Sequence, residues 1–283
     1  MSEEKEFKSL KAKIDSRLAL LNQQAKKSLG QNFLIDEDII DKIINTVSIK
    51  GKYILEIGPG TGNLTKGILN YNPKKLIVIE KDNDLALLLN KNFKDKITII
   101  NDDILKFDEK NYINNKLTVF GNLPYNISTE ILCKWIINLN DDKFWFDELL
   151  LMFQKEVADR IIAKFDTSDY GRLSILSNWK LHIKKICDIP PKSFFPKPKV
   201  NSTLLHFYPK EKFFFIKDPK NLEKITRIFF NQRRKMIKKP FNLIFNGDTK
   251  IIDKLKINLN LRPQNLDFST YYNLVREYEN LRS

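Results

Sequence analysis

The sequence predicts an α/β fold, a parallel sheet with helices, followed by a small all-helical C-terminal domain. Between about residues 50 and 163, apolar runs of four or five residues alternate with segments of helical spacing. This alternation is typical of βαβ units, whose buried parallel strands carry continuous apolar residues. A glycine-rich turn at residues 58–62 follows the first run, and after about Tyr208 the βαβ pattern gives way to helical spacing.

Each run and each intervening segment has a predicted structure. Strands are expected at residues 53–57, 76–79, 97–100, 117–120 and 149–153. Helices are expected at residues 64–69, 85–89, 128–137 and 156–163, where apolar side chains recur at helical spacing. Residues 179–186 and 203–207 could add antiparallel strands that close the sheet. Beyond them, residues 222–236, 251–259 and 271–278 are expected to be helical.

These elements predict three segments of chain. Residues 1–25 have apolar side chains at helical spacing and form a leader; residues 26–207 form the sheet domain, and residues 208–283 the helical domain. The net charge of the chain is +14. From His206 to Ser283 there are 17 Lys and Arg against 8 Asp and Glu, a net charge of +9. This bias toward the helical domain favours a basic face and a polyanionic partner.

Composition excludes several classes of protein. Hydrophobic residues make up 42% of the 283 residues and charged residues 30%, as in a soluble globular protein. No apolar run approaches the ~18 residues of a membrane span, and residues 1–13 lack a signal-peptide core, so a cytoplasmic protein is expected. Cys133 and Cys187 lie far apart, which argues against a disulfide framework. His182 and His206 are isolated, so no metal site is expected and each is expected to be packed or solvated.

Asn122-Leu123-Pro124-Tyr125 follows the fourth predicted strand and suits the methylation of an exocyclic amine on a nucleobase. Such an amine is a poor nucleophile, because its lone pair is delocalised into the ring. The Asn122 side-chain oxygen and the Leu123 carbonyl can accept its two hydrogens and hold the lone pair toward an electrophile. Pro124 stiffens the turn, and Tyr125 offers a flat face for an extruded base. An ordinary strand-to-loop turn is the alternative, and the tetrapeptide alone does not decide between them.

Glu56-Ile57-Gly58-Pro59-Gly60-Thr61-Gly62 follows the first strand, where glycines let the backbone approach a ligand. Glu80 ends the next strand and can hold ribose hydroxyls. This spacing favours S-adenosylmethionine over a dinucleotide, whose G-x-G-x-x-G loop receives a pyrophosphate. After the third strand, Asp102 or Asp103 could accept a hydrogen bond from the adenine amine, or could belong to a solvated turn.

Several ordered motifs together resemble the KsgA-type ribosomal RNA adenine dimethyltransferases, over about residues 26–266. They are SLGQNFL at 28–34, EIGPGTG at 56–62, NLPYNIST at 122–129, YGRLS at 170–174, FFPKPKV at 194–200 and RRK at 233–235. The resemblance implies a Rossmann-like class I S-adenosylmethionine-dependent methyltransferase domain, with S-adenosylhomocysteine as product. It favours Asp103 over Asp102 at the adenine, and it places residues 28–34 over the methionine end of the cofactor. The cofactor-binding residues are then expected to be Asn32, Leu34, Glu56, Gly58, Gly60, Glu80, Asp103 and Asn122.

The same resemblance implies the substrate, two adjacent adenosines near the 3′ end of 16S rRNA in an immature 30S subunit, and a monomeric enzyme. Phe194 would pack against the target base and join the tetrapeptide as a catalytic residue, although its residue type alone favours a core position. Residues expected to contact RNA are Lys197, Lys199, Arg233, Arg234 and Lys235. Three consecutive cations spread over much of a helix circumference, so not all of the last three can serve one phosphate track.

Two other functions remain open. An Erm-type 23S rRNA methyltransferase would share the fold and most site residues, although Leu123 and residues 194–200 favour the small-subunit family. A non-catalytic assembly factor would retain the fold without the chemistry, and the intact Asn122, Pro124 and Tyr125 argue against that as the only role. An NAD-dependent oxidoreductase is excluded by the glycine spacing and the tetrapeptide.

Overall fold

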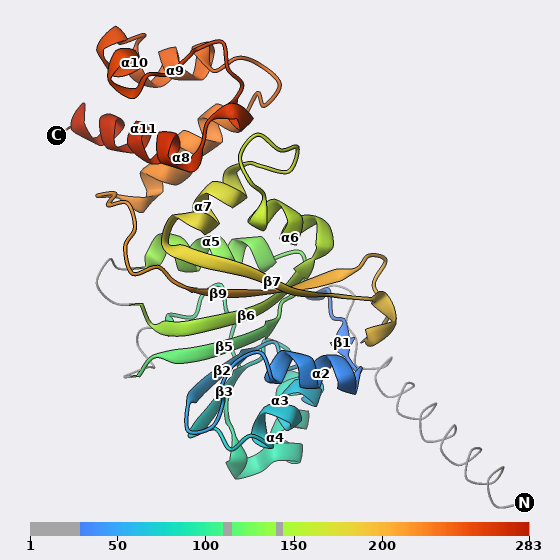
Figure 1. The fold of residues 1–283 in the computed structure, drawn as a ribbon. Coiled ribbons are helices and arrows are strands. Elements are labelled where there is room, and N and C mark those ends of the chain that lie inside the picture. Colours follow the sequence, from blue (N-terminus) through green and yellow to red (C-terminus); the bar gives the residue numbers. More distant parts are fainter. Residues whose placement is uncertain (1–28, 110–114, 140–143, 283) are drawn as a thin grey trace, which may run out of the picture. The chain divides into compact units, whose positions relative to one another are not determined.

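The computed structural model describes residues 29–109, 115–139 and 144–282 (Figure 1). The expected leader, residues 1–25, lies outside these. Contacts divide the chain into two compact units. The first contains the described parts of residues 1–128, with residues 145–155 and 186–206. The second contains the described parts of residues 129–144, with residues 156–185 and those described from 207 onward.

This division differs from a single boundary after residue 207. Most of α5 (Ser128–Asn138), nearly all of α6 (Lys155–Ile162) and all of α7 (Arg172–Lys180) belong to the second unit, together with the C-terminal helices. Tertiary contacts place α7 in the second unit. This helix packs against α8 and α11, and the Tyr272 hydroxyl of α11 donates to the Ile175 carbonyl of α7 at 3.1 Å. Sequence periodicity shows only that a helix follows a strand, and such long-range contacts lie outside its reach.

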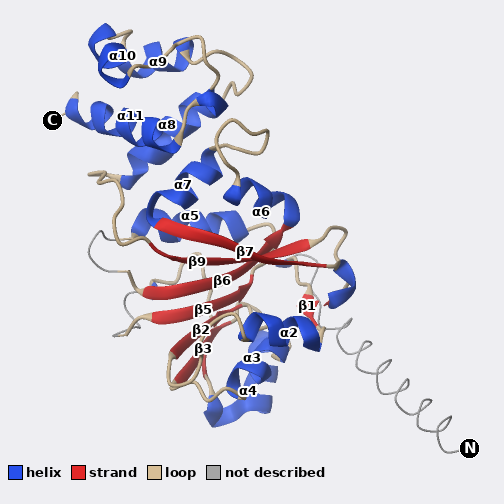
Figure 2. Ribbon diagram, in the orientation of Figure 1, coloured by secondary structure: helices blue, strands red, loops and turns tan. Residues whose placement is uncertain are grey.

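The main sheet has the strand order β4-β3-β2-β5-β6-β9-β7, drawn in red in Figure 2. Its strands are β2 (Tyr53–Ile57), β3 (Lys75–Ile79), β4 (Thr98–Ile100), β5 (Leu117–Asn122), β6 (Phe146–Gln154), β7 (Leu181–Ile189) and β9 (Ser202–Pro209). β2 is parallel to β3 and β5, β3 to β4, and β5 to β6. All five predicted parallel strands are therefore confirmed.

In the first unit, α2 (Glu37–Ile44) and α3 (Asn63–Leu69) lie side by side (Figure 1). A Cβ on Gly67 would come within 2.4 Å of Ile44 Cδ1, so the glycine permits this close approach. Together with sheet residues such as Ile54 and Phe120, these helices bury an apolar core. Each fully buried side chain of this kind contributes about 1.5–3 kcal/mol. α4 (Asn83–Phe93) follows β3 and begins at the Asp82 cap.

In the second unit, the described chain after β9 is helical (Figure 2). Its helices are α8 (Pro219–Phe230), α9 (Lys238–Phe245), α10 (Thr249–Leu255) and α11 (Phe268–Asn280). α8 was expected to extend to Met236, but it ends at Phe230, and Arg233 to Lys235 lie in the turn that follows. α10 also ends before the expected residue 259.

Other differences from the expected elements are local. Trp179 was assigned to a strand but belongs to α7, where its indole N–H donates to the Phe214 carbonyl at 2.7 Å. β5 continues through Asn122, which pairs with Met152, so the tetrapeptide begins inside the sheet. Helices α2 and α9 are not among the elements expected from the sequence. Neither is the two-stranded sheet of β1 (Phe33–Leu34) and β8 (Phe194–Phe195).

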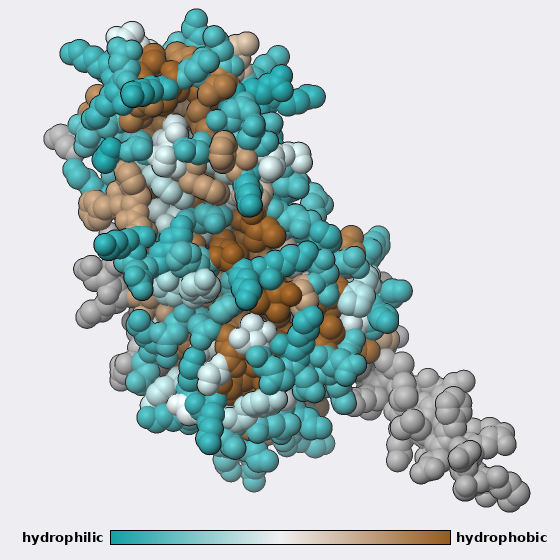
Figure 3. Space-filling view, viewed as in Figure 1, coloured by the Kyte–Doolittle hydropathy of each residue, from teal (hydrophilic) through white to brown (hydrophobic). Residues whose placement is uncertain are grey.

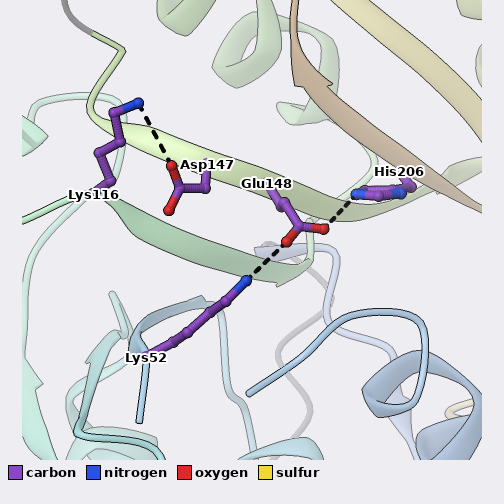
Figure 4. A network of polar contacts seen from close by, with 5 residues as sticks. All are labelled: Lys52, Lys116, Asp147, Glu148 and His206. Carbon is purple, nitrogen blue, oxygen red and sulfur yellow. Dashed lines mark hydrogen bonds and ion pairs between the residues drawn. The ribbon is translucent and has the colours of Figure 1, made fainter. Parts of the chain in front are cut away.

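In the first unit, polar contacts connect Asp147 and Glu148 of β6 with His206 of β9 and with the residues just before β2 and β5 (Figure 4). The Glu148 carboxylate lies 2.9 Å from Lys52 Nζ and 2.9 Å from His206 Nε2, and Lys116 pairs with Asp147 at 3.6 Å. His206, expected to be packed or solvated, thus has a carboxylate partner. Partly exposed pairs of this kind contribute about 0–1 kcal/mol each.

The face shown in Figure 3 is mostly hydrophilic, with scattered hydrophobic residues. None of the helices in the described ranges is sufficiently long and apolar to span a membrane. Within the same ranges, no three His, Cys, Asp or Glu side chains form a group that could hold a metal ion.

Candidate active site

A cavity in the first unit lies at the carboxyl ends of β2, β3 and β5. Its lining comes from residues 29–34, 56–61, 63–64, 79–81, 85, 102–105 and 122–127. In open α/β sheets, ligands bind outside the carboxyl ends of parallel strands. The opening motif, the glycine loop, the two predicted acidic positions and the tetrapeptide thus surround one space.

The glycine loop turns sharply between β2 and α3. Gly58, Gly60 and Gly62 have φ of +65°, +59° and +84°, a conformation that L-residues with a side chain rarely adopt. A Cβ on Gly60 would lie 2.7 Å from Phe33 Cδ1, and one on Gly58 would lie 3.6 Å from the Asn122 carbonyl oxygen. These glycines therefore bring the loop close to both the opening motif and the tetrapeptide.

Two buried carboxyl groups lie beneath this loop. Glu80 accepts hydrogen bonds from the Gly60 N–H at 3.1 Å and the Asp82 N–H at 2.9 Å, and its burial raises its pKa. Each carboxylate oxygen has a second lone pair, so Glu80 can also accept ribose hydroxyls. Glu56 accepts from Thr65 Oγ1 at 2.7 Å, and burial raises the pKa of Glu56 to about 8.

Asp103 sits at the cavity rim beside a cation. Lys81 Nζ lies 2.8 Å from Asp103 Oδ2, and the Leu105 N–H donates to Asp103 Oδ1 at 3.0 Å. The hydrogen bond from Lys81 is the main reason why the pKa of Asp103 is lowered. Asp102 also lines the cavity and accepts from the Asp103 N–H. Asp103 is therefore held ionised and in place, while the choice between the two as adenine acceptor stays a prediction.

The side chain of Asn122 has a fixed orientation. Its amide nitrogen donates to the Asn32 carbonyl at 2.7 Å, so its oxygen remains available as an acceptor. Further along the motif, the Pro124 carbonyl accepts from the Ile127 N–H at 3.1 Å. The Tyr125 carbonyl likewise accepts from Ser128 Oγ, at 3.2 Å. The Leu123 carbonyl is thus the candidate for the second acceptor.

Tyr125 is held at its hydroxyl by a residue that the sequence analysis missed. The Tyr125 hydroxyl lies 2.5 Å from Ser202 Oγ, at the start of β9, and Ser202 is fully buried. Burial raises the pKa of Tyr125, so the phenol stays neutral at physiological pH. These two residues are 77 positions apart, and no local pattern connects them.

The opening motif is hydrogen-bonded to the first residue of α3 and to the N-cap of α4. Asn63 Nδ2 donates to the Leu34 carbonyl at 2.7 Å, and Gln31 Nε2 donates to Asp82 Oδ2 at 3.1 Å. The expected residues Asn32 and Leu34 are thus brought to the cavity. Asn63 and Gln31 also line it, although the sequence analysis did not select them.

Phe194 lies elsewhere. Its side chain is 2% exposed, pairs with Leu34 across the β1–β8 sheet and belongs to the apolar core. It is absent from the described residues that line the cavity. The core position that its residue type favoured is therefore the observed one, because an aromatic ring beside β1 gains more from burial than from solvent. Lys197 and Lys199, farther along this segment, are exposed.

In the second unit, Arg234 and Lys235 are exposed, whereas Arg233 is partly buried. The guanidinium of Arg233 donates to the Tyr170 carbonyl at 2.8 Å and also to the Ser168 carbonyl. Of this predicted RNA-binding triplet, two side chains therefore face solvent and one is engaged within the unit.

Comparisons with known proteins show what this chain is similar to. The sequence profile of the family described as ribosomal RNA adenine dimethylase matches residues 22–280. The ribosomal RNA small subunit methyltransferase A of Pelagibacter ubique (strain HTCC1062) is 64% identical over 92% of this chain and 98% of its own. The protein of the same name from Wolbachia sp. subsp. Drosophila simulans (strain wRi) is 43% identical, covering 90% and 93%.

Two solved structures are also similar. A dimethyladenosine transferase from Plasmodium falciparum has a TM-score of 0.72 and 28% identity, covering 88% of this chain and 98% of the other. The 23S rRNA methyltransferase ErmE has a TM-score of 0.64 and 19% identity, covering 88% and 100%. At that identity, ErmE shows a shared fold alone.

Proposed function

This chain belongs to the ribosomal RNA adenine dimethylase family, and on that premise we propose that it dimethylates N6 of two adjacent adenosines near the 3′ end of 16S rRNA. It is a methyltransferase, and its α/β, Rossmann-like class I fold with a C-terminal helical part is the one predicted from sequence. The relatives named for the small subunit, at 64% and 43% identity, favour 16S rRNA over the Erm-type alternative.

The cavity suits S-adenosylmethionine. Four acidic side chains line it, against one lysine, Lys81. Burial raises the pKa of Glu56 to about 8, so Glu56 is mostly neutral at physiological pH, and Glu80, Asp102 and Asp103 are the groups that make the cavity acidic. An acidic cavity favours a cofactor that carries a sulfonium and an ammonium group, and it disfavours a pyrophosphate. When bound, S-adenosylmethionine supplies an electrophilic methyl group. Glu80 would hold the ribose, Asp103 the adenine amine, and residues 28–34 the methionine end.

One observation carries the catalytic proposal, the 2.7 Å hydrogen bond from Asn122 Nδ2 to the Asn32 carbonyl. Because this bond uses the amide donor, the Asn122 oxygen can accept a hydrogen from adenine N6. The Leu123 carbonyl accepts the other, and the lone pair of the amine then turns out of the ring plane. Tyr125 stacks on the extruded base. These residues position the reactants, which is the main contribution required for a transfer driven by a sulfonium leaving group.

Dimethylation requires the same residues twice. After the first transfer, N6 keeps one hydrogen, so one of the two acceptors suffices to orient it. The proton leaves after attack, when N6 has become acidic, and a strong base is unnecessary. The neutral Tyr125 phenol, held by Ser202, keeps its ring face for both cycles.

The physiological substrate in this proposal is an immature 30S subunit, bound by a cytoplasmic monomer. The exposed cations Arg234, Lys235, Lys197 and Lys199 would contact phosphates, so binding should weaken steeply as salt rises. The net charge of +14 supports a polyanionic partner. The family resemblance supports the particle and the monomer.

Transfer of a tritiated methyl group from S-adenosylmethionine to purified, unmethylated 30S and 50S particles tests the proposal. We expect label in 16S rRNA with the wild type, and none with Asn122→Ala. Asn70→Ala is the matched control, because Asn70 is an exposed residue outside the cavity lining. Label in 23S rRNA alone would assign the Erm-type function. No label in either particle, with tight 30S binding, would indicate an assembly factor.

A further inference from the structure

Two motifs take no part in the methyl transfer itself, residues 170–174 and 233–235, and a side-chain contact joins them. Arg233 Nη2 donates to the Tyr170 carbonyl at 2.8 Å and also contacts the carbonyls of Ser168 and Thr167. Arg233 Nε donates to Gln264 Oε1 at 3.4 Å. One guanidinium thus braces the loop that connects α6 to α7 in the second unit (Figure 1).

The same loop is fixed at other points. The Asp166 N–H donates to the Gln264 carbonyl at 2.9 Å, and Asn265 Nδ2 donates to Asp166 Oδ1 at 2.5 Å. Asp166 has a φ of +66°, which forms the sharp turn of the loop. The loop ends at Tyr170, whose buried ring packs edge-to-face on Phe268 at 5.3 Å. The backbone of residues 163–171, the brace loop, is therefore held independently of what its exposed side chains contact.

An aromatic side chain stands on this fixed loop. Residues 164–169 are exposed between the buried Ala163 and Tyr170. Among them, Phe165 is 51% exposed and follows the exposed Lys164. A ring held out by a rigid loop loses little conformational entropy when a partner covers it, so its position favours binding.

We propose that the brace loop is an RNA-stacking element, in which Phe165 stacks on an unpaired rRNA base and Arg233 positions the loop. This inference rests on the proposed function, since it assumes an rRNA substrate. The neighbouring cations support RNA as the occupant. Lys164 precedes Phe165, and Arg234 and Lys235 follow the brace residue itself. An aromatic face beside cations is the arrangement that binds unpaired nucleotides, because every base has a π-face.

Arg233 acts here through the loop and not through a phosphate. Its rigid, planar guanidinium directs Nη2 to the loop carbonyls and Nε to Gln264 at the same time, whereas a lysine has all its donors on one flexible ammonium and none at the position of Nε. Arg234, the next residue, is exposed and keeps its cation for solvent or phosphate. The two arginines therefore form a matched pair with opposite expectations.

Phe165→Ala tests the stacking contact directly. At saturating 30S particles we expect kcat to be unchanged, whereas Kd for unmethylated 30S should rise about 5- to 100-fold. Because no charge is removed, the slope of log Kd against log salt should stay that of the wild type. Phe165→Trp should bind at least as tightly as the wild type. Leu87→Ala, a 69% exposed residue of the first unit, is the control. Unchanged 30S affinity in Phe165→Ala would overturn the proposal.

The arginine pair separates positioning from charge. Both Arg233→Lys and Arg234→Lys keep the cation, so an electrostatic role predicts equal, small effects. If Arg233 acts by positioning the loop, Arg233→Lys should weaken 30S binding nearly as much as Phe165→Ala does. The double variant that combines Arg233→Lys with Phe165→Ala should then bind 30S little more weakly than either single variant. Equal effects of the two lysine variants would contradict the brace. Phe165→Ala, an exposed substitution, keeps the proposal testable if Arg233→Lys fails to fold.

A cross-link identifies the partner. A photoreactive p-benzoylphenylalanine placed at position 165 and irradiated on 30S particles should yield an adduct that ribonuclease shortens. An adduct with a ribosomal protein would overturn the assignment to RNA. Wild-type methyl transfer to 30S reports on the proposed function separately, so the two proposals can fail independently.

Discussion

Asn122 and Arg233 both use a side-chain N–H to bind backbone carbonyls, but with opposite results. Asn122 donates to Asn32 at 2.7 Å and keeps an oxygen that can accept a hydrogen bond at the cavity. Arg233 donates to the carbonyls of Thr167, Ser168 and Tyr170 and has no acceptor to offer. The first contact aims a reactive group, and the second fixes a loop. The role of a motif residue therefore follows from which of its polar atoms the fold leaves available.

Asn122→Asp is expected to cause the largest loss of methyl-transfer rate. The carboxylate keeps acceptor oxygens but loses the donor, and it would repel the Asn32 carbonyl. We expect the single-turnover rate on 30S particles to fall about 10²- to 10³-fold, which is the usual cost when an enzyme loses one preorganised polar group from its active site. A rate near that of the wild type would show that an acceptor alone is sufficient and that the Asn32 contact is incidental.

Ser202→Ala should lower kcat about tenfold, because loss of a hydrogen bond is worth about 0.5–1.5 kcal/mol and the Tyr125 ring is freed. Tyr125→Phe should have a similar effect, and the double variant should be no worse, since both remove one contact. Ser202→Thr keeps the hydroxyl, so activity near that of the wild type in this variant would support the view that Ser202 positions the Tyr125 ring. Fully additive effects of the two single variants would show that Ser202 acts on something other than Tyr125.

Glu56 should make the stability of the ligand-free protein depend on pH. Burial raises the pKa of Glu56 from 4.5 to about 8. The contribution of Glu56 to the free energy of unfolding is therefore fully present below pH 4.5 and is lost as the pH rises through 8. In Glu56→Gln this loss should disappear. Urea unfolding at pH 5, 6.5 and 8 should show the difference between the two proteins changing by a few kcal/mol. A constant difference would mean that Glu56 ionises normally.

The smallest effect is expected at the exposed rim. Lys81→Met should weaken binding of S-adenosylhomocysteine up to about fivefold near neutral pH, because partly exposed pairs are worth about 0–1 kcal/mol. The Lys81 contact lowers the pKa of Asp103, so its loss should move the acid limb of binding to higher pH. Lys81→Arg should retain the wild-type limb. Calorimetric titrations with S-adenosylhomocysteine between pH 4 and 8 measure this limb. If the pKa of Asp103 does not depend on Lys81, affinity will fall at the same pH in Lys81→Met as in the wild type.

Sequence reasoning succeeded where function depends on local geometry. Residues 53–57 form a strand with the predicted bounds, and Gly58 and Gly60 have the positive φ that a close backbone approach requires. Asn122 reaches the cavity because β5 ends there. Strand ends and glycine turns are properties of short segments, so a single sequence contains them.

Contacts between distant segments could not be predicted in this way. Ser202 approaches Tyr125 only after β9 has joined the sheet, and Phe194 is drawn into the core by its pairing with β1. The motif at 233–235 was expected on a helix, but α8 ends first and Arg233 turns toward Tyr170. Residue spacing along the chain carries no record of these partners.

Mass-spectrometric analysis of 16S rRNA, after reaction of the protein with unmethylated 30S particles, would locate the transferred methyl groups. We expect N6,N6-dimethyladenosine at two adjacent positions near the 3′ end, formed by the wild type and absent with Asn122→Ala. Dimethyladenosine formed by Asn122→Ala at the wild-type rate, or methyl groups at any atom other than adenine N6, would contradict this expectation.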